Sequence, residues 1–325
     1  MTKAIRFYQT GGPDVLKWEE VAVAEPGPGQ VRIRQTAVAV NYRDVLIRNG
    51  LHKVANLPSG LGLEAAGVID GIGPNVPDLA VGDRVVCVAG PDGAYAQARL
   101  VPAARVIKLP DTISDRQAAA MMIRGMTARY LVRETYRVGT GDWVLVHAAA
   151  GGVGTILCQW AKHLGAHVIG TVGSDSKIEA ARANGCEHVL LPSAGDFVDT
   201  VRGFTANKGV DVVYDSIGLA TFEQSMKCLR RRGMLVSFGE SSGDPEPVPP
   251  RHLGQMGSLF LTHPSLPDYT STRVDLLSTA YDLFDMVGSG KIRIDVTAEY
   301  PLQDAGRAHA DLESRKTVGA ILLIV

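Results

Sequence analysis

The chain has 325 residues, of which 46% are hydrophobic and 21% charged, and its 33 basic residues nearly balance its 34 acidic ones. This length exceeds what one hydrophobic core usually supports, so we expect two domains. The balanced charge excludes a broad basic surface, and we expect no nucleic-acid partner. No apolar run approaches the roughly 18 residues of a membrane span, and no signal peptide is recognisable. We therefore expect a cytoplasmic protein, not bound to membrane, whose specificity lies in a local pocket.

The N-terminal part of the chain has the pattern of short strands. Residues 31–38 alternate between apolar and polar side chains, and turn clusters at 26–29 and 81–83 bound such segments. Alternation of period two between Gly- and Pro-containing turns is typical of strands. This part of the sequence predicts an irregular, strand-rich domain.

The middle of the chain alternates apolar strands with helical segments, which predicts a parallel sheet with helices on both faces. We expect strands at 143–148, 167–172, 188–191, 210–215 and 233–238, with helices at 153–164 and 177–184. A further strand is predicted at 258–261, followed by a helix with Val274, Leu277, Tyr281 and Phe284 at helical spacing. The last strand, 320–324, is expected to return to the first domain.

A glycine-rich loop connects the strand at 143–147 to the helix after it. Gly151 and Gly154 stand at two positions of a dinucleotide-binding fingerprint, whereas Ala149 stands where the first glycine is expected. Such glycines let the backbone approach a pyrophosphate, which also meets the free N–H groups of the helix N-terminus. A tight turn without a ligand is the alternative. The strand and helix alternation that follows favours dinucleotide binding.

The end of the next strand indicates which dinucleotide is bound. NAD-binding proteins of this kind carry a carboxylate there, which holds the ribose 2′-hydroxyl. Here Gly173 and Ser174 follow the strand, and Lys177 comes three residues later. The absence of a carboxylate and the presence of a cation favour the 2′-phosphate of NADPH, although Asp175 adds a nearby negative charge and Lys177 could be a solvated surface residue.

Several motifs, in the same order over nearly the whole chain, resemble the quinone oxidoreductase (zeta-crystallin-like) branch of the medium-chain dehydrogenase/reductase superfamily. They are the run 148–161, Asn41-Tyr42-Arg43-Asp44, Leu57-Pro58-Ser59-Gly60, Gly62-Leu63-Glu64-Ala65-Ala66-Gly67, Val212-Val213-Tyr214-Asp215-Ser216, Phe238-Gly239 and Leu312-Glu313-Ser314-Arg315. The resemblance implies an α/β fold in which a doubly wound Rossmann domain, residues 125–264, is inserted into a strand-rich GroES-like catalytic domain, residues 1–124 plus 265–325. It also implies a nicotinamide cleft between the domains and a homodimer, for which the strand at 258–261 is the expected interface.

The same resemblance implies a set of residues around NADPH. The cleft candidates are Asn41, Tyr42, Leu46 and His52, and the cofactor-binding candidates are Asn41, Tyr42, Thr127, Tyr130, Gly152, Val153, Gly154, Gly173, Ser174, Lys177, Ser216, Phe238, Ser241 and Arg315. Structural alternatives stay open for some of them: Phe238 as a core residue, Asn41 as a turn residue, Tyr130 as a helix-packing residue and Arg315 as a surface cation.

Two positions argue against a catalytic zinc. Zinc-dependent members of the superfamily have a Cys where this chain has Asn41, and a His where it has Leu63. A tetrahedral zinc would lack half of its protein ligands, so we expect no metal. Glu64 is expected to be a buried, hydrogen-bonded carboxylate.

The predicted function is hydride transfer from NADPH to a quinone. A reduced quinone is a stabilised anion that water can protonate, so no strong catalytic acid is required. Related quinone reductases often have tyrosines where this chain has Leu46, His52 and Pro192. An enone or enoyl reductase, or a non-catalytic NADPH-binding protein, therefore remains an alternative, and His52 could donate a proton or could lie on an exposed loop.

Overall fold

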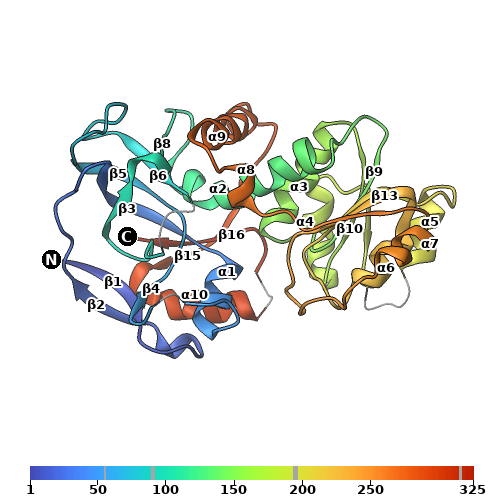
Figure 1. Ribbon diagram of the computed structural model, residues 1–325, viewed down its shortest axis with the longest axis horizontal. Helices are drawn as coiled ribbons and strands as arrows, with labels where there is room; N and C mark the ends of the chain where they lie inside the picture. The colour runs from blue at the N-terminus through green and yellow to red at the C-terminus, as the bar shows by residue number, and fades with distance from the viewer. Residues whose placement is uncertain (55, 89–91, 193–196, 315–316) are drawn as a thin grey trace. The chain divides into compact units, whose positions relative to one another are not determined.

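The computed structural model describes residues 1–54, 56–88, 92–192, 197–314 and 317–325. The chain forms two compact units (Figure 1). The first unit comprises Met1–Ile123, Ser271–Gly288 and Ile294–Val325. The second comprises Arg124–Thr270 and Ser289–Arg293.

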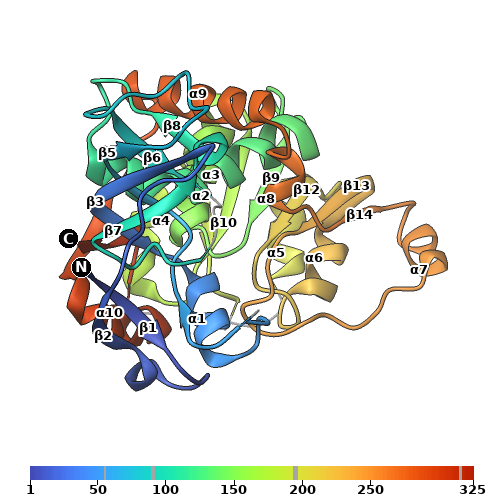
Figure 2. The ribbon, with the colours of Figure 1, turned by 60° about the vertical axis from the view of Figure 1, so that its left-hand side comes forward.

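The second unit is built on a six-stranded sheet whose pairs are all parallel (Figure 2). Its strands lie in the order β11-β10-β9-β12-β13-β14, so the chain starts in the middle, builds to one edge and then crosses back. This is the order of a doubly wound fold, and the predicted Rossmann architecture is confirmed. The strands are β9 (Trp143–Val146), β10 (His167–Thr171), β11 (His188–Leu190), β12 (Val210–Asp215), β13 (Leu229–Ser237) and β14 (Phe260–Thr262).

Both faces of this sheet are covered because its strands are apolar on both sides. On one face, Leu145, Ile169 and Leu235 pack against α5 and α6 through Val201 and Met226. On the other face, α3 lies against β9 and β10. The helices of this unit are α3 (Gly152–His163), α4 (Ile178–Ala183), α5 (Val198–Phe204), α6 (Phe222–Cys228), α7 (Pro250–Gln255) and α8 (Leu266–Tyr269). Helix α2 (Asp115–Tyr130) begins in the first unit and ends in this one.

The first unit contains two sheets, and almost all of their pairs are antiparallel. The larger sheet has the order β15-β16-β3-β5-β6-β8, with β7 also paired to β3, and the smaller has the order β2-β1-β4. Along β3, Val31 and Ile33 are buried whereas Arg32 and Arg34 between and after them are not, as the predicted alternation requires. The strands are β1 (Thr2–Phe7), β2 (Lys17–Val21), β3 (Gln30–Val40), β4 (Ser59–Gly60), β5 (Ala65–Ile72), β6 (Arg84–Cys87), β7 (Ala98–Pro102), β8 (Val106–Lys108), β15 (Val296–Pro301) and β16 (Ala320–Ile324).

Segments from both ends of the sequence meet in the larger sheet. β16 pairs antiparallel with β3, with Leu322 opposite Ala39 and Leu323 opposite Val38. The prediction that the last strand returns to the first domain is therefore confirmed. Helices α1 (Tyr42–Asn49), α9 (Arg273–Gly288) and α10 (Ala305–Glu313) complete this unit.

The predicted helix after the last strand of the doubly wound sheet is α9, but its buried face differs from the predicted stripe. Val274 is 75% exposed and Tyr281 48% exposed. The buried stripe is formed by Leu276, Ala280, Leu283, Phe284 and Val287. The apolar residues of this helix fit two overlapping stripes of helical spacing, and only packing on the rest of the unit selects one.

None of the helices within the described ranges is long and apolar enough to cross a membrane.

Candidate functional site

The glycine loop is a tight turn between β9 and α3. Ala148 has a φ of 51°, and its carbonyl accepts a hydrogen bond from the Gly151 N–H at 2.8 Å. The Ala149 N–H donates to the Thr171 carbonyl of β10 at 2.9 Å. A Cβ on Gly154 would clash with the Ala148 carbonyl oxygen and lie 2.9 Å from the Ala149 Cα. Backbone packs on backbone here, so Gly154 is required although Ala149 replaces the first glycine of the fingerprint.

This loop delivers the N-terminus of α3 to the carboxyl edge of the sheet. The first N–H groups of a helix have no acceptor within it, and the helix dipole places its positive end there. The first turn of α3 carries no acidic side chain that would neutralise this end. Gly152, Val153 and Gly154 therefore form a site that fits the pyrophosphate of a dinucleotide.

Four of the remaining predicted cofactor residues follow strands of the same sheet. Gly173 and Ser174 come after β10, Ser216 after β12 and Phe238 after β13. The Phe238 N–H donates to the Asp215 carbonyl at 2.8 Å, and the Ser241 N–H donates to the Ser216 carbonyl at 3.4 Å. The strand order reverses between β9 and β12, so the glycine loop and Ser216 lie at the point where doubly wound sheets bind ligands. Gly173, Ser174 and Phe238 follow the next strands on either side, β10 and β13.

The turn after β10 leaves room for a bound group. A Cβ on Gly173 would meet no atom within 4 Å. Ser174 shares a hydrogen bond with the Ser176 hydroxyl at 2.9 Å, and the Lys177 N–H donates to the Ser174 carbonyl at 3.1 Å. Lys177 is half-buried at the end of this short turn, Asp175–Lys177. The turn thus combines open space, hydroxyl groups and one cation, a donor set that suits a phosphate.

A buried polar network lies at the carboxyl ends of β9, β10 and β12, and it was not predicted from the sequence. His147 Nδ1 is 2.9 Å from the Thr171 hydroxyl, and its Nε2 is 2.9 Å from the Ser225 hydroxyl. Ser225 donates to Asp215 Oδ2 at 2.8 Å, so it accepts from His147, which places the proton of the neutral ring on Nε2. Burial lowers the pKa of His147 and favours this neutral form. A signal was available, since Thr171 and Asp215 are the last residues of β10 and β12 and His147 directly follows β9.

Thr127 and Tyr130 lie on α2 rather than at the strand ends. Tyr130 is 2% exposed, and its ring stacks on Tyr269 with centroids 4.2 Å apart. Burial raises the pKa of the Tyr130 hydroxyl. This packing agrees with the structural role considered for Tyr130. Arg315, another predicted cofactor residue, lies outside the described residues.

The first unit gathers the other predicted site residues around α1. Asn41 precedes the helix, Tyr42 begins it and Leu46 lies within it. The His52 N–H donates to the Leu46 carbonyl at 2.8 Å, so the chain after α1 folds back on the helix and brings these two candidates together. Asn41 is buried, whereas Tyr42, Leu46 and His52 are partly exposed.

The positions compared with zinc ligands hold a different arrangement. Asn41 Nδ2 donates to Glu64 Oε1 at 2.8 Å, and the Ile123 N–H donates to Glu64 Oε2 at 2.7 Å. Glu64 is fully buried, as predicted, and the apolar Leu63 is 8% exposed. Over the described part of the chain, no three His, Cys, Asp or Glu side chains stand together as metal ligands. These residues do not fit a tetrahedral zinc site.

A second buried network, also missed, lies below the start of α1. The Tyr95 hydroxyl is 3.0 Å from Asp44 Oδ2 and 3.0 Å from His309 Nε2, and the Asn41 N–H donates to the same Asp44 oxygen at 2.9 Å. Desolvation raises the pKa of Asp44 to about 7, and the nearby Glu64 charge adds to the effect. Burial and the Arg48 charge lower the pKa of His309 to about 3. The group adjoining Asn41 is thus a carboxyl that titrates near neutral pH.

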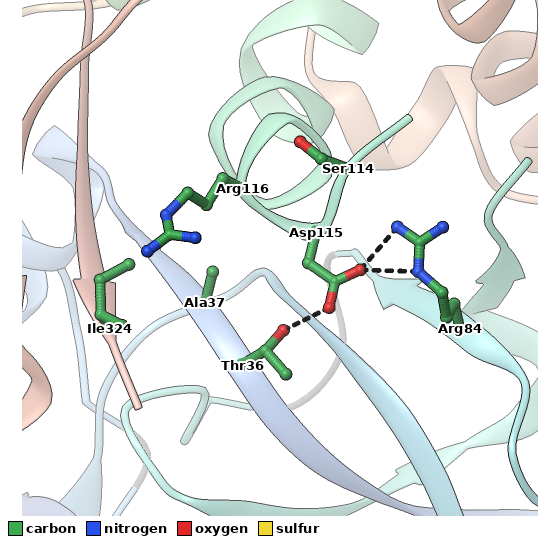
Figure 3. Close-up of a pocket in the computed structure, with 7 residues that line it drawn as sticks. All are labelled: Thr36, Ala37, Arg84, Ser114, Asp115, Arg116 and Ile324. Carbon is green, nitrogen blue, oxygen red and sulfur yellow. Dashed lines mark hydrogen bonds and ion pairs between the residues drawn. The ribbon is translucent and has the colours of Figure 1, made fainter. Parts of the chain in front are cut away.

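A hollow of about 460 Å³ lies on the first unit, lined by Thr36, Ala37, Arg84, Ser114, Asp115, Arg116 and Ile324 (Figure 3). The Asp115 carboxylate lies between Arg84 and Thr36. Arg84 Nη2 donates to Asp115 Oδ1 at 2.8 Å, and the Thr36 hydroxyl donates to Asp115 Oδ2 at 2.7 Å. Arg116 pairs with Glu299 at 2.8 Å. The charged side chains of this hollow are thus all paired, Asp115 with Arg84 and Arg116 with Glu299, which lies outside the lining, and we assign the hollow no role in the site.

Comparison with known proteins agrees with this geometry. Residues 27–111 match the alcohol dehydrogenase GroES-like domain family, and residues 152–272 match the zinc-binding dehydrogenase family. The chain is 46% identical to the 2-haloacrylate reductase of a Burkholderia species, over 100% of this chain and 99% of that one. It is 44% identical to quinone oxidoreductase 1 of Escherichia coli K12, over 100% of both.

Solved structures give the same result. The Escherichia coli quinone oxidoreductase complexed with NADPH superposes with a TM-score of 0.97 at 44% identity, covering 99% of this chain and 100% of that one. The resemblance identified in the sequence is therefore confirmed. The chain belongs to the quinone oxidoreductase branch of the medium-chain dehydrogenase/reductase superfamily.

Proposed function

We propose that this protein is a zinc-independent oxidoreductase that transfers hydride from NADPH to a quinone. The observation that carries the proposal is the carboxyl edge of the doubly wound sheet. There, the α3 N-terminus fits a pyrophosphate, and the turn after β10 offers Gly173, Ser174 and Lys177 in place of a carboxylate. The relative solved with NADPH supports this choice of cofactor. A cytoplasmic location remains a prediction of the sequence.

Each unit has a part in this proposal. The Rossmann domain, residues 125–264, would hold NADPH with the glycine loop, the turn after β10, Thr127, Tyr130, Ser216, Phe238 and Ser241. The catalytic domain, residues 1–124 plus 265–325, would bring Asn41 and Tyr42 to the nicotinamide and Leu46 and His52 to the acceptor. NADPH, when bound, supplies the hydride. The protein's task is then to orient the acceptor and exclude water, since a reduced quinone needs no strong acid.

The first test concerns the 2′-phosphate. Replacing Lys177 by Ala is expected to weaken NADPH binding by about 1–3 kcal/mol and to leave NADH binding nearly unchanged, because only NADPH carries the group that the cation would meet. Titration calorimetry with both cofactors measures the difference. Lys208→Ala, which removes an exposed lysine from the same unit, is the matched control. Equal losses for NADPH and NADH in the Lys177 variant would refute this role.

A specific observation also favours a second candidate, reduction of an activated carbon–carbon double bond. One relative at 46% identity is a 2-haloacrylate reductase, and this chain has Leu46 and His52 where related quinone reductases often have tyrosines. Hydride addition to such a bond leaves a carbanion that must be protonated on carbon, a step that His52 could assist. Steady-state assays with NADPH against quinones, simple enones and 2-haloacrylate distinguish the two reactions.

The acceptor site itself can be tested by substitution. Leu46→Tyr and His52→Tyr are each expected to change the ratio of kcat/KM between a quinone and an enone several-fold, with little change in NADPH affinity. Leu51→Tyr is the control, because Leu51 lies in the same segment and is 74% exposed. Unchanged ratios in both variants would remove Leu46 and His52 from the acceptor site.

We also propose a homodimer formed along β14. This strand is the last of its sheet, and its side chains Phe260 and Leu261 are 56% and 37% exposed. An apolar edge strand invites pairing with another strand, and pairing with a second copy would cover it. Phe260→Glu is expected to give monomers at micromolar concentration in sedimentation velocity, whereas Val274→Glu, at an exposed apolar residue of α9, should not change the assembly. A monomeric wild-type protein with full activity would contradict the proposal.

A further inference from the structure

The buried polar network at the carboxyl ends of β9, β10 and β12 has a fixed direction of hydrogen bonding. All four of its side chains are at most 2% exposed: His147, Thr171, Asp215 and Ser225. Ser225 Oγ has two further neighbours, Asp215 Oδ2 at 2.8 Å and the Thr221 carbonyl at 2.9 Å, and both of them only accept hydrogen bonds. The His147 Nε2–H must therefore donate to Ser225, which leaves Nδ1 to accept from the Thr171 hydroxyl at 2.9 Å.

Each strand that the network joins runs directly into a turn of the proposed cofactor site. The glycine loop follows His147 at the end of β9. Thr171 stands two residues before Gly173, and Asp215 stands directly before Ser216. One buried imidazole ring thus connects the strand ends from which three of the proposed binding turns begin.

Asp215 extends the network into the turn that carries Ser216. Asp215 Oδ1 accepts the N–H groups of Ile217 and Gly218 at 2.8 and 3.1 Å, and the Thr221 hydroxyl donates to Asp215 Oδ2 at 2.8 Å. Every polar side-chain atom of the network therefore has a partner. Such a network holds its elements in one arrangement, because any other arrangement leaves a buried polar group without a hydrogen bond.

We propose that His147 is a positioning residue of the dinucleotide site. Through Thr171 on one side and Ser225 on the other, it fixes the spacing of the glycine loop, the turn after β10 and the turn after β12. That spacing matters because one dinucleotide must meet all three turns at once. His147 itself is buried and touches no ligand. The inference rests on the proposed function, which assigns the cofactor to these turns.

The test measures NADPH and NADH binding to the full chain by titration calorimetry, together with unfolding in denaturant. Thr171→Val and Ser225→Ala each remove one hydroxyl and are expected to weaken both cofactors about 3- to 10-fold. Thr171→Ser keeps the hydroxyl and should bind both as the wild type does. Because Thr171 and Ser225 act through the same ring, the double variant should lose less than the product of the two single losses.

Thr205→Val is the matched control. Thr205 is a buried threonine of the same unit, and its hydroxyl donates to the Arg202 carbonyl of α5 at 2.9 Å. This variant should lose stability and keep its cofactor affinity. A loss of affinity equal to that of Thr171→Val would show that any destabilisation of the unit has the same effect, and it would overturn the inference.

Two further results would overturn the inference and leave the proposed function standing. One is wild-type cofactor affinity in folded Thr171→Val and Ser225→Ala, and the other is a double variant in which the single losses simply multiply. If one of the two single variants does not fold, the affinity of the other decides. A wild-type protein that binds NADH but not NADPH would refute the proposed function, and the losses measured with NADH would then decide this inference. Failure to bind either dinucleotide would refute both.

Discussion

Gly154→Ala is expected to abolish measurable binding of both NADPH and NADH and to lower the free energy of unfolding by about 1–3 kcal/mol. The added methyl group would meet the Ala148 carbonyl oxygen and the Ala149 Cα, which are backbone atoms and cannot turn away as a side chain does. The loop or the first turn of α3 must therefore move, and the N–H groups proposed to hold the pyrophosphate move with it. Chemical unfolding and cofactor titration measure the two effects.

The same substitution elsewhere in the second unit provides the control for Gly154→Ala. Gly203 lies in α5, and a Cβ there would meet nothing within 4 Å. Gly203→Ala should leave cofactor binding unchanged and raise stability by up to about 1 kcal/mol, because alanine is the better helix former. Normal cofactor affinity in Gly154→Ala would show that the close approach of loop and helix does not shape the binding site.

Asp44→Asn is expected to change how stability depends on pH. The pKa of Asp44 is raised from 3.8 to about 7 in the folded protein, so the folded state holds a proton that the unfolded chain releases between these values. The contribution of this carboxyl to the free energy of unfolding is therefore fully present below pH 3.8, and it is lost as the pH rises toward 7 and above. The loss at pH 8 is about 4 kcal/mol, taken as an upper limit at 1.36 kcal/mol per pKa unit.

The neutral amide that Asp44→Asn introduces removes this dependence. Relative to the variant, the wild type should lose stability between pH 4 and pH 8, as measured by denaturant unfolding at each pH. His309 has a lowered pKa and destabilises the fold as pH falls below 6.5, in the opposite direction, but it is present in both proteins and largely cancels in the difference. Asp111→Asn, at an exposed turn, should follow the wild type. Parallel curves for Asp44→Asn and the wild type would contradict the shifted pKa.

The parts of this protein that could be predicted from sequence are those set by local pattern. The strands of the doubly wound sheet are short apolar runs separated by amphipathic helices, and the glycine loop has a fixed place between a strand and a helix. Topology follows from these elements because parallel connections have few allowed arrangements. The return of the last strand to the first domain was also predicted, since an apolar strand near the end of the chain needs a sheet to join, but the sequence did not indicate β3 as its partner.

The parts that could not be predicted depend on contacts between distant residues. The Thr171, His147, Ser225 and Asp215 network joins four elements, and no spacing in the sequence relates Ser225 to His147. Arg124 is an ordinary residue of α2 until packing brings it to Gly152. On α9, two apolar stripes compete, and the choice of Leu276 and Leu283 over Val274 and Tyr281 is made by the surface on which the helix packs.

The pairing of β3 with β16 also has a consequence for the order in which the protein can fold on the ribosome. β3 emerges early, but the strand that covers its edge is translated almost last, after every strand of the doubly wound sheet. The second unit can therefore assemble while the first still presents an unpaired edge with Val38 and Val40 awaiting their neighbours Ile321 and Leu323. Nascent chains stalled before residue 320 should bind chaperones through this edge, because incomplete sheets with exposed apolar strands are the species that such factors recognise.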